Sequence, residues 1–193
     1  MRREQLLHVG IGAIIAIAVI IPLGVFAFVR SGIYNVGASS PHTSFTEWIT
    51  HETMIHSVGR RAQDIRTAKM ASNPQVRRGF CEYEAHCVAC HGASAVARQP
   101  WVSGMEPAPP YLLDVTQRFK PRELFWIAKN GIKMTGMPAW RNSMPDDRLW
   151  ALAAFIEAMP KMDSQTYLRW RSEGFCRPVS GQLTPGPLSI PRP

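Results

Sequence analysis

A long uncharged segment stands near the start of the chain. From Val9 to Val29 there is no Asp, Glu, Lys or Arg, and Arg30 ends the run. A helix rises about 1.5 Å per residue, so this segment is long enough to cross the roughly 30 Å hydrocarbon core of a bilayer. The pattern predicts a transmembrane anchor over residues 8–30, preceded by a short polar N-terminus over residues 1–7.

A cleaved secretory signal is the alternative interpretation of this segment. Val25-Phe26-Ala27 has the spacing of a signal-peptidase site. However, the apolar run is longer than the roughly 7–15 residues of a usual signal core and continues past that site, which favours a retained anchor. Arg2 and Arg3 favour a cytoplasmic N-terminus. We therefore expect a single-pass protein of a bacterial inner membrane, with the rest of the chain in the periplasm.

Residues 31–72 combine a turn-rich linker with a predicted amphipathic helix. Ser44, followed by Glu47 three residues later, has the form of a capping box. Beyond it, apolar residues recur at helical spacing, which predicts a helix over residues 45–69. The predicted apolar stripe consists of Trp48, Ile55, Val58, Ala62 and Ile65. This stripe is expected to pack against the remaining domain, a partner subunit or the membrane surface.

Three more helices are predicted within residues 73–162, which makes the fold class all-α. The first opens at Asn73-Pro74, where proline at the first helical position costs no hydrogen bond. A shorter helix covers Pro121–Asn130 and is stopped by Gly131. The third begins at Pro145, and its predicted buried stripe consists of Leu149, Leu152, Ala153 and Ile156. Residues 163–193 follow as a C-terminal tail, which we expect to be extended.

Composition narrows the class of protein. The chain has 193 residues, a hydrophobic fraction of 46% and a formal net charge of +8, which excludes a disordered chain and a protein with many membrane spans. No nucleic-acid-binding module matches the sequence, so nucleic acid is not an expected partner. The positive charge is expected to serve docking to a membrane surface or an acidic protein; a merely solvated basic surface is the alternative.

Three histidines in the linker and the predicted amphipathic helix are candidate metal ligands. They are His42, His51 and His56. The last two are five residues apart, whereas a spacing of four places two ligands on one helix face. We therefore interpret these histidines as hydrogen-bonded or exposed side chains.

The segment Cys87-Val88-Ala89-Cys90-His91 has the form of the c-type haem attachment motif. Two thiols one helical turn apart can each form a thioether to a vinyl group on one edge of a porphyrin. The adjacent histidine then reaches the iron as proximal ligand. A thioredoxin-like pair would need alternating strands and helices, and a zinc site would need a second ligand pair at suitable spacing. Neither context surrounds the motif, so one covalent haem c is expected.

A second iron ligand is expected downstream of the motif. Met137 lies in Gly136-Met137-Pro138, where glycine permits close backbone approach and proline stiffens the loop. Met105 and Met134 are rival candidates. Thioether sulfur opposite histidine raises the reduction potential of a haem. The predicted axial pair is His91 and Met137.

The order of these motifs resembles the class I cytochrome c family over roughly residues 74–160. Besides the haem motif and Gly136-Met137-Pro138, the positions of Gly79, Phe80 and Tyr83 resemble the family's N-terminal helix contacts. The resemblance implies a proline carbonyl that accepts a hydrogen bond from the proximal histidine, for which Pro110 is the first candidate and Pro109 the second. It also implies a C-terminal helix that crosses the first one. The anchor, the additional amphipathic helix and the tail depart from the family pattern.

Two further cysteines, Cys81 and Cys176, lie in the similar contexts Gly-Phe-Cys. Haem is attached outside the cytoplasm, where disulfides also persist. We predict a disulfide between them that clamps the tail onto the first helix of the domain. Two buried free thiols are the alternative.

Electron transfer is the function that these features favour, and no acid–base or nucleophilic machinery is evident. A haem enzyme or gas sensor would need an open iron position, which Met137 is expected to close. The expected partners are other redox proteins or subunits of a membrane complex, such as a dehydrogenase or a terminal oxidase of a respiratory chain. The retained anchor and additional helix favour a bound subunit over a free shuttle.

Overall fold

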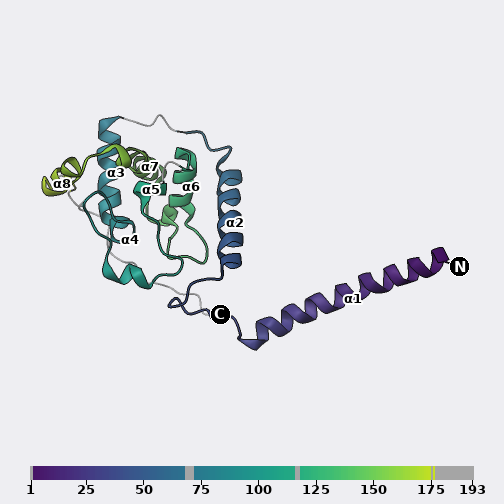
Figure 1. The fold of residues 1–193 in the computed structure, drawn as a ribbon. Helices are drawn as coiled ribbons and strands as arrows, with labels where there is room; N and C mark the ends of the chain where they lie inside the picture. Colours follow the sequence, from purple (N-terminus) through teal and green to yellow (C-terminus); the bar gives the residue numbers. More distant parts are fainter. Residues whose placement is uncertain (1, 68–71, 116–117, 175, 177–193) are drawn as a thin grey trace. The chain divides into compact units, whose positions relative to one another are not determined.

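The computed structural model describes residues 2–67, 72–115, 118–174 and 176, and its regular elements are helices (Figure 1). The described residues contain no β-strand. The chain forms two compact units, Met1–Ser40 and Pro41–Pro193, which are described separately below. The predicted all-α fold class is confirmed.

The first unit consists of helix α1 (Arg2–Ser31) and the linker after it. Every described residue of α1 is exposed, although the helix is strongly apolar and includes Pro22. In the part of the chain that the structure describes, α1 is the one helix long and apolar enough to cross a membrane. It includes the whole predicted segment 8–30 and is a candidate membrane span.

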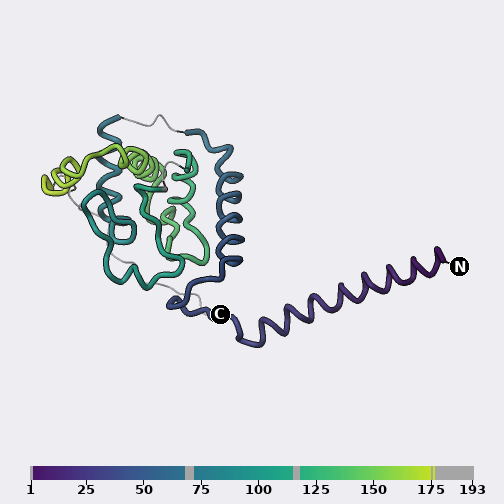
Figure 2. The backbone as a smooth tube through the Cα atoms, viewed as in Figure 1, coloured from purple at the N-terminus to yellow at the C-terminus, as the bar shows by residue number. Residues whose placement is uncertain are grey.

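The second unit is built from helices and short 3-10 turns joined by long loops, whose path Figure 2 traces. In chain order the elements are α2 (Ser44–Ala62), α3 (Asn73–His86), α4 (Val88–His91), η1 (Pro100–Gly104), α5 (Leu112–Val115), α6 (Pro121–Asn130), η3 (Trp140–Asn142), α7 (Asp146–Ala158), η4 (Met159–Lys161) and α8 (Ser164–Ser172).

Helices α3 and α7 pack closely and form the centre of the core. At their contact, a Cβ atom added to Gly79 would lie 1.9 Å from the backbone oxygen of Ala151, so only glycine allows this approach. Beside it, the rings of Phe80 and Phe155 meet edge to face with 5.5 Å between centroids. The predicted stripe of α7, namely Leu149, Leu152, Ala153 and Ile156, is buried.

Helix α6 has the bounds that its sequence predicts. Glu123 accepts a hydrogen bond from the backbone N–H of Lys120 at 2.8 Å, and Gly131 ends the helix with φ of 65°. Its buried face packs against α7, where the rings of Phe125 and Trp150 stack with 4.2 Å between centroids. The position of α6 fixes where the loop after it begins.

Helix α2 differs from the prediction at both ends. Thr43, not Ser44, is the N-cap: it has extended backbone angles, and its side chain accepts a hydrogen bond from the N–H of Thr46. The helix ends at Ala62 instead of residue 69, because the chain turns there and the partly buried Ile65 packs against the core. The predicted apolar stripe is buried over only part of its length. Val58 and Ala62 are buried, whereas Trp48 is 59% exposed. Helix α2 packs against α6.

The prediction that residues 163–193 are extended is wrong for α8. Asp163 caps this helix by accepting a hydrogen bond from the N–H of Thr166 at 2.8 Å. Tyr167 is fully buried, and both Tyr167 and Trp170 meet the ring of Phe80 edge to face. Packing of these two aromatic side chains against the core stabilises the helix. The rest of the predicted tail, residues 177–193, lies outside the described residues.

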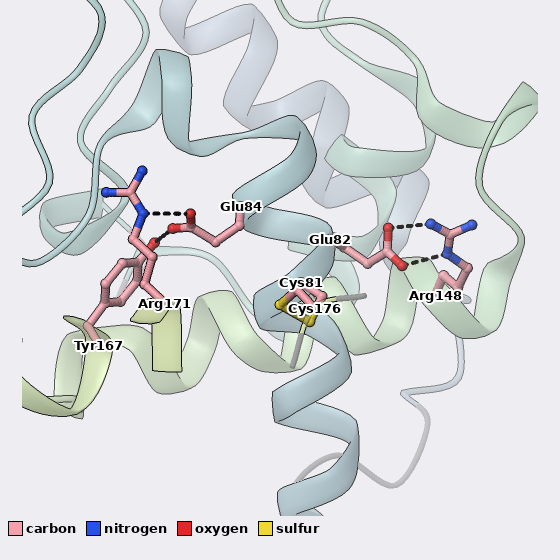
Figure 3. Close-up of a disulfide and its surroundings, with 7 residues drawn as sticks. All are labelled: Cys81, Glu82, Glu84, Arg148, Tyr167, Arg171 and Cys176. Atoms are coloured by element: carbon pink, nitrogen blue, oxygen red, sulfur yellow. Dashed lines mark hydrogen bonds and ion pairs between the residues drawn. A yellow bond between two sulfur atoms is a disulfide. The ribbon is translucent and has the colours of Figure 1, made fainter. Parts of the chain in front are cut away.

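Three successive contacts tie α3 to the elements after the haem motif (Figure 3). A disulfide joins Cys81 to Cys176, with 5.2 Å between their Cα atoms. The buried Glu82 forms a two-pronged ion pair with Arg148 of α7, at 2.5 and 2.6 Å. On α8, Tyr167 and Arg171 both donate to the carboxylate of Glu84. Helix α3 is therefore held to α7 and α8 by charge as well as by apolar packing.

Candidate functional site

The two cysteines and the histidine of the attachment motif lie within one helical turn. Helix α3 ends at His86, Cys87 interrupts the helical conformation, and α4 restarts at Val88. The backbone N–H groups of Cys90 and His91 both donate to the carbonyl of Cys87. This turn brings two thiols and an imidazole to one end of α3, the arrangement that haem attachment requires.

His91 is oriented by a carbonyl of the loop before α5. Its Nδ1 donates a hydrogen bond to the carbonyl of Pro110 at 2.8 Å, because a carbonyl oxygen can only accept. The accepting residue is Pro110 and not Pro109. Nε2 is then the unprotonated nitrogen of a neutral ring. Burial lowers the pKa of His91, and the hydrogen bond to Pro110, which raises the pKa, has a smaller effect. A neutral imidazole with a free lone pair on Nε2 is the form that binds iron.

Cys87 and Cys90 are both free thiols. Cys87 is buried, and burial raises the pKa of its thiol to about 12, with smaller contributions from Cys90 and Glu82. At neutral pH the Cys87 thiol is therefore protonated, unlike the low-pKa thiol of a redox-active cysteine pair. This disfavours the thioredoxin-like alternative.

The backbone of Met137 is fixed from both sides by its own loop. Its carbonyl accepts a hydrogen bond from the N–H of Ile132 at 3.2 Å, and its N–H donates to Oγ1 of Thr135 at 3.1 Å. Thr135 in turn donates to the carbonyl of Ile132. Gly131 allows the two ends of this loop to approach each other, since a Cβ atom at Gly131 would lie 2.6 Å from the carbonyl oxygen of Met137. The loop therefore presents Met137 in one backbone conformation.

The two rival methionines occupy different positions. Met134 is 96% exposed at a residue with φ of 59°, so it does not lie in a buried ligand position. Met105 is partly buried, and a Cβ added at Gly136 would meet its methyl carbon at 2.0 Å. Met105 thus packs against the loop that carries Met137. Because Gly136 has no side chain, the two loops can approach each other.

Two contacts that sequence reasoning missed support the segment around His91. The buried Tyr83 donates to the carbonyl of Gly92, and burial raises the pKa of this tyrosine above its ordinary value, so the hydroxyl stays protonated. The guanidinium of Arg98 lies over the ring of Tyr111, 3.3 Å from its centroid. Since Tyr111 follows Pro110 directly, this contact steadies the loop that orients His91. In the sequence, the signal for the contact between Arg98 and Tyr111 is that Tyr111 directly follows Pro110.

The match with a known family covers this whole site. Residues 74–156 match the family model described as cytochrome C oxidase, cbb3-type, subunit III. The chain carries a c-type cytochrome domain. The matched range of this cytochrome domain runs from α3 into α7 and includes Cys87, Cys90, His91, Pro110 and Met137. No curated protein and no solved structure matches the chain.

A cytochrome c domain implies haem c, and the residues of this domain fit that group. The donor set consists of an imidazole nitrogen with a hydrogen-bonded partner nitrogen, a thioether sulfur on a closed loop, and two free thiols one turn apart. Imidazole and thioether are the axial donors of electron-carrying cytochromes. The site is therefore suited to an iron that accepts and donates electrons.

Proposed function

We propose that this cytochrome holds one covalently attached haem c and transfers single electrons in a respiratory chain. Cys87 and Cys90 would form the two thioethers, His91 would bind the iron through Nε2, and Met137 through its sulfur. When bound, the haem supplies an iron that alternates between the ferrous and ferric states. The observation that carries the proposal is the hydrogen bond from Nδ1 of His91 to Pro110, because it leaves Nε2 as the metal-binding nitrogen.

The residues of the chain act here by positioning the groups that would bind the iron. Pro110 holds the imidazole in one tautomer and orientation, and the loop of residues 131–137 holds the backbone of Met137. With their positions fixed, His91 and Met137 would bind the iron in both oxidation states, which would keep the reorganisation that accompanies electron transfer small. Binding of Met137 would also leave no open iron position, which disfavours the alternative of a haem enzyme or gas sensor.

Helix α1 supports a proposal for the position of the cytochrome domain in the cell. We infer that α1 anchors the chain in a bacterial inner membrane and that the domain lies in the periplasm, where haem c is attached. Arg2 and Arg3 before the apolar run support this orientation. We further infer that the chain is a subunit of a larger membrane complex, a terminal oxidase or dehydrogenase. The description of the matching family, which names an oxidase subunit, supports the first of these.

Mass spectrometry of the denatured full-length protein tests the attachment. We expect the mass of the chain plus one haem, because thioether bonds survive denaturation. The double variant Cys87→Ser/Cys90→Ser is expected to have the mass of the chain alone and to release any haem into acidified acetone. A wild-type chain that loses its haem on denaturation, or that carries two, would contradict the proposal.

A further inference from the structure

The first two turns of α2 carry an exposed apolar patch. Phe45, Trp48 and Ile49 are 68%, 59% and 45% exposed. Their spacing of three and four residues places them on one helix face. The rings of Phe45 and Trp48 lie 6.1 Å apart, so the side chains form one continuous surface, which we call the α2 patch.

The α2 patch does not belong to the core of the domain. The buried residues of α2, Val58 and Ala62, lie on a different face, roughly a third of a turn around the helix. On the face of the patch, the next positions are Glu52 and His56, which lie 3.6 Å apart and are exposed to solvent. The apolar surface therefore ends after two turns and is confined to the end of α2 that the linker enters.

The length of the linker limits how far this end of α2 can lie from the end of α1. Residues 32–43 join the two helices and span at most about 40 Å when fully extended. Part of that length is lost to a turn, in which Asn35 accepts a hydrogen bond from the N–H of Gly37 and Ser40 donates to the carbonyl of Gly37. If α1 spans the membrane, the α2 patch is held within reach of the headgroup layer.

We propose that the α2 patch inserts into the headgroup layer of the membrane that α1 crosses. This inference rests on the proposed role of α1 as an anchor. Tryptophan favours the membrane–water interface, and tryptophan and phenylalanine are typical of the apolar face of helices that lie in it. A tether makes even a small contact effective. The patch consists of three side chains, whereas a stable protein interface has roughly 20–30 residues a side, so the size of the patch fits a lipid surface better than a partner subunit.

A second point of attachment would orient the cytochrome domain. Helix α2 packs against α6, and α6 leads directly into the loop of residues 131–137 that carries Met137. With α2 in the headgroup layer, the domain cannot rotate freely about its linker. The α2 patch thus holds the electron-transfer site in one orientation toward partners in the same membrane.

Photo-crosslinking of the full-length cytochrome tests this inference. The crosslinking residue p-benzoylphenylalanine replaces Trp48, His56 or Ile20 in separate variants. Each variant is irradiated in vesicles of phosphatidylethanolamine and phosphatidylglycerol and in native membranes. His56 is the matched control, because it lies on the face of the patch but beyond its apolar end, with its side chain 83% exposed. Ile20 lies within α1 and reports the anchor.

We expect lipid adducts at Trp48 several-fold above those at His56, together with strong lipid adducts at Ile20. Lipid adducts at Ile20 but none above the His56 level at Trp48 would overturn the inference and leave the anchor intact. Adducts at Trp48 with a protein and not with lipid would overturn it in favour of a partner subunit. If Ile20 forms no lipid adduct, the anchor itself fails, and the inference fails with it.

Discussion

The Met137→Ala variant is expected to change from low-spin to high-spin haem. Its reduction potential is expected to fall by more than about 0.1 V, which is a fraction of the roughly 0.8 V range over which axial ligands set haem potentials. Alanine has no donor atom, so the iron would lose its sixth protein ligand. The thioether also favours the ferrous state, and its removal stabilises ferric iron. Optical spectra during a potentiometric titration measure both effects in one sample.

Two matched methionine variants make this experiment specific. Met134→Ala is expected to leave the spectrum and the potential unchanged, because the side chain of Met134 is 96% exposed. Met105→Ala is expected to keep the haem low-spin, with at most a small shift, because Met105 packs against the loop near Gly136. A high-spin Met105→Ala variant beside a low-spin Met137→Ala variant would exchange the roles of these residues.

The double variant Cys81→Ser/Cys176→Ser is expected to lose about 2–4 kcal/mol of unfolding free energy. The disulfide closes a loop with a sequence separation of 95, so its removal gives the unfolded chain many more conformations. It also releases the segment after α8 from α3. Denaturant unfolding of the holoprotein, followed by circular dichroism, measures the loss.

The double variant is preferable to either single one, because a lone thiol at position 81 or 176 could compete for partners with Cys87 and Cys90. Its absorption spectrum is expected to remain low-spin, since the disulfide contributes no ligand to the iron. Equal denaturation midpoints for variant and wild type would show that the disulfide does not stabilise the domain.

Local sequence signals were sufficient for the elements with strong boundaries. Pro121 and Gly131 bracket α6, and Asn73-Pro74 opens α3, so the bounds of α6 and the start of α3 follow from backbone chemistry alone. The apolar spacing of α7 likewise identifies its buried face. The chemistry of the site could also be predicted from the sequence, because the attachment motif is contiguous.

The features that sequence reasoning missed depend on contacts between distant segments. Helix α8 is stabilised by packing Tyr167 and Trp170 against Phe80, which precedes the helix by more than eighty residues. The exposure of Trp48 depends on which face of α2 meets α6, and helical spacing alone does not decide this. The hydrogen bond from Tyr83 to Gly92 likewise depends on the path of the loop after His91.

A spectroscopic redox titration of the purified full-length wild-type cytochrome tests the central claim most directly. The account predicts one haem that titrates as a single one-electron centre, remains six-coordinate and low-spin in both oxidation states, and does not bind added carbon monoxide. A five-coordinate haem, or one that binds carbon monoxide readily in the ferrous state, would contradict ligation by His91 and Met137. Such a result would favour a haem enzyme or gas sensor over an electron carrier.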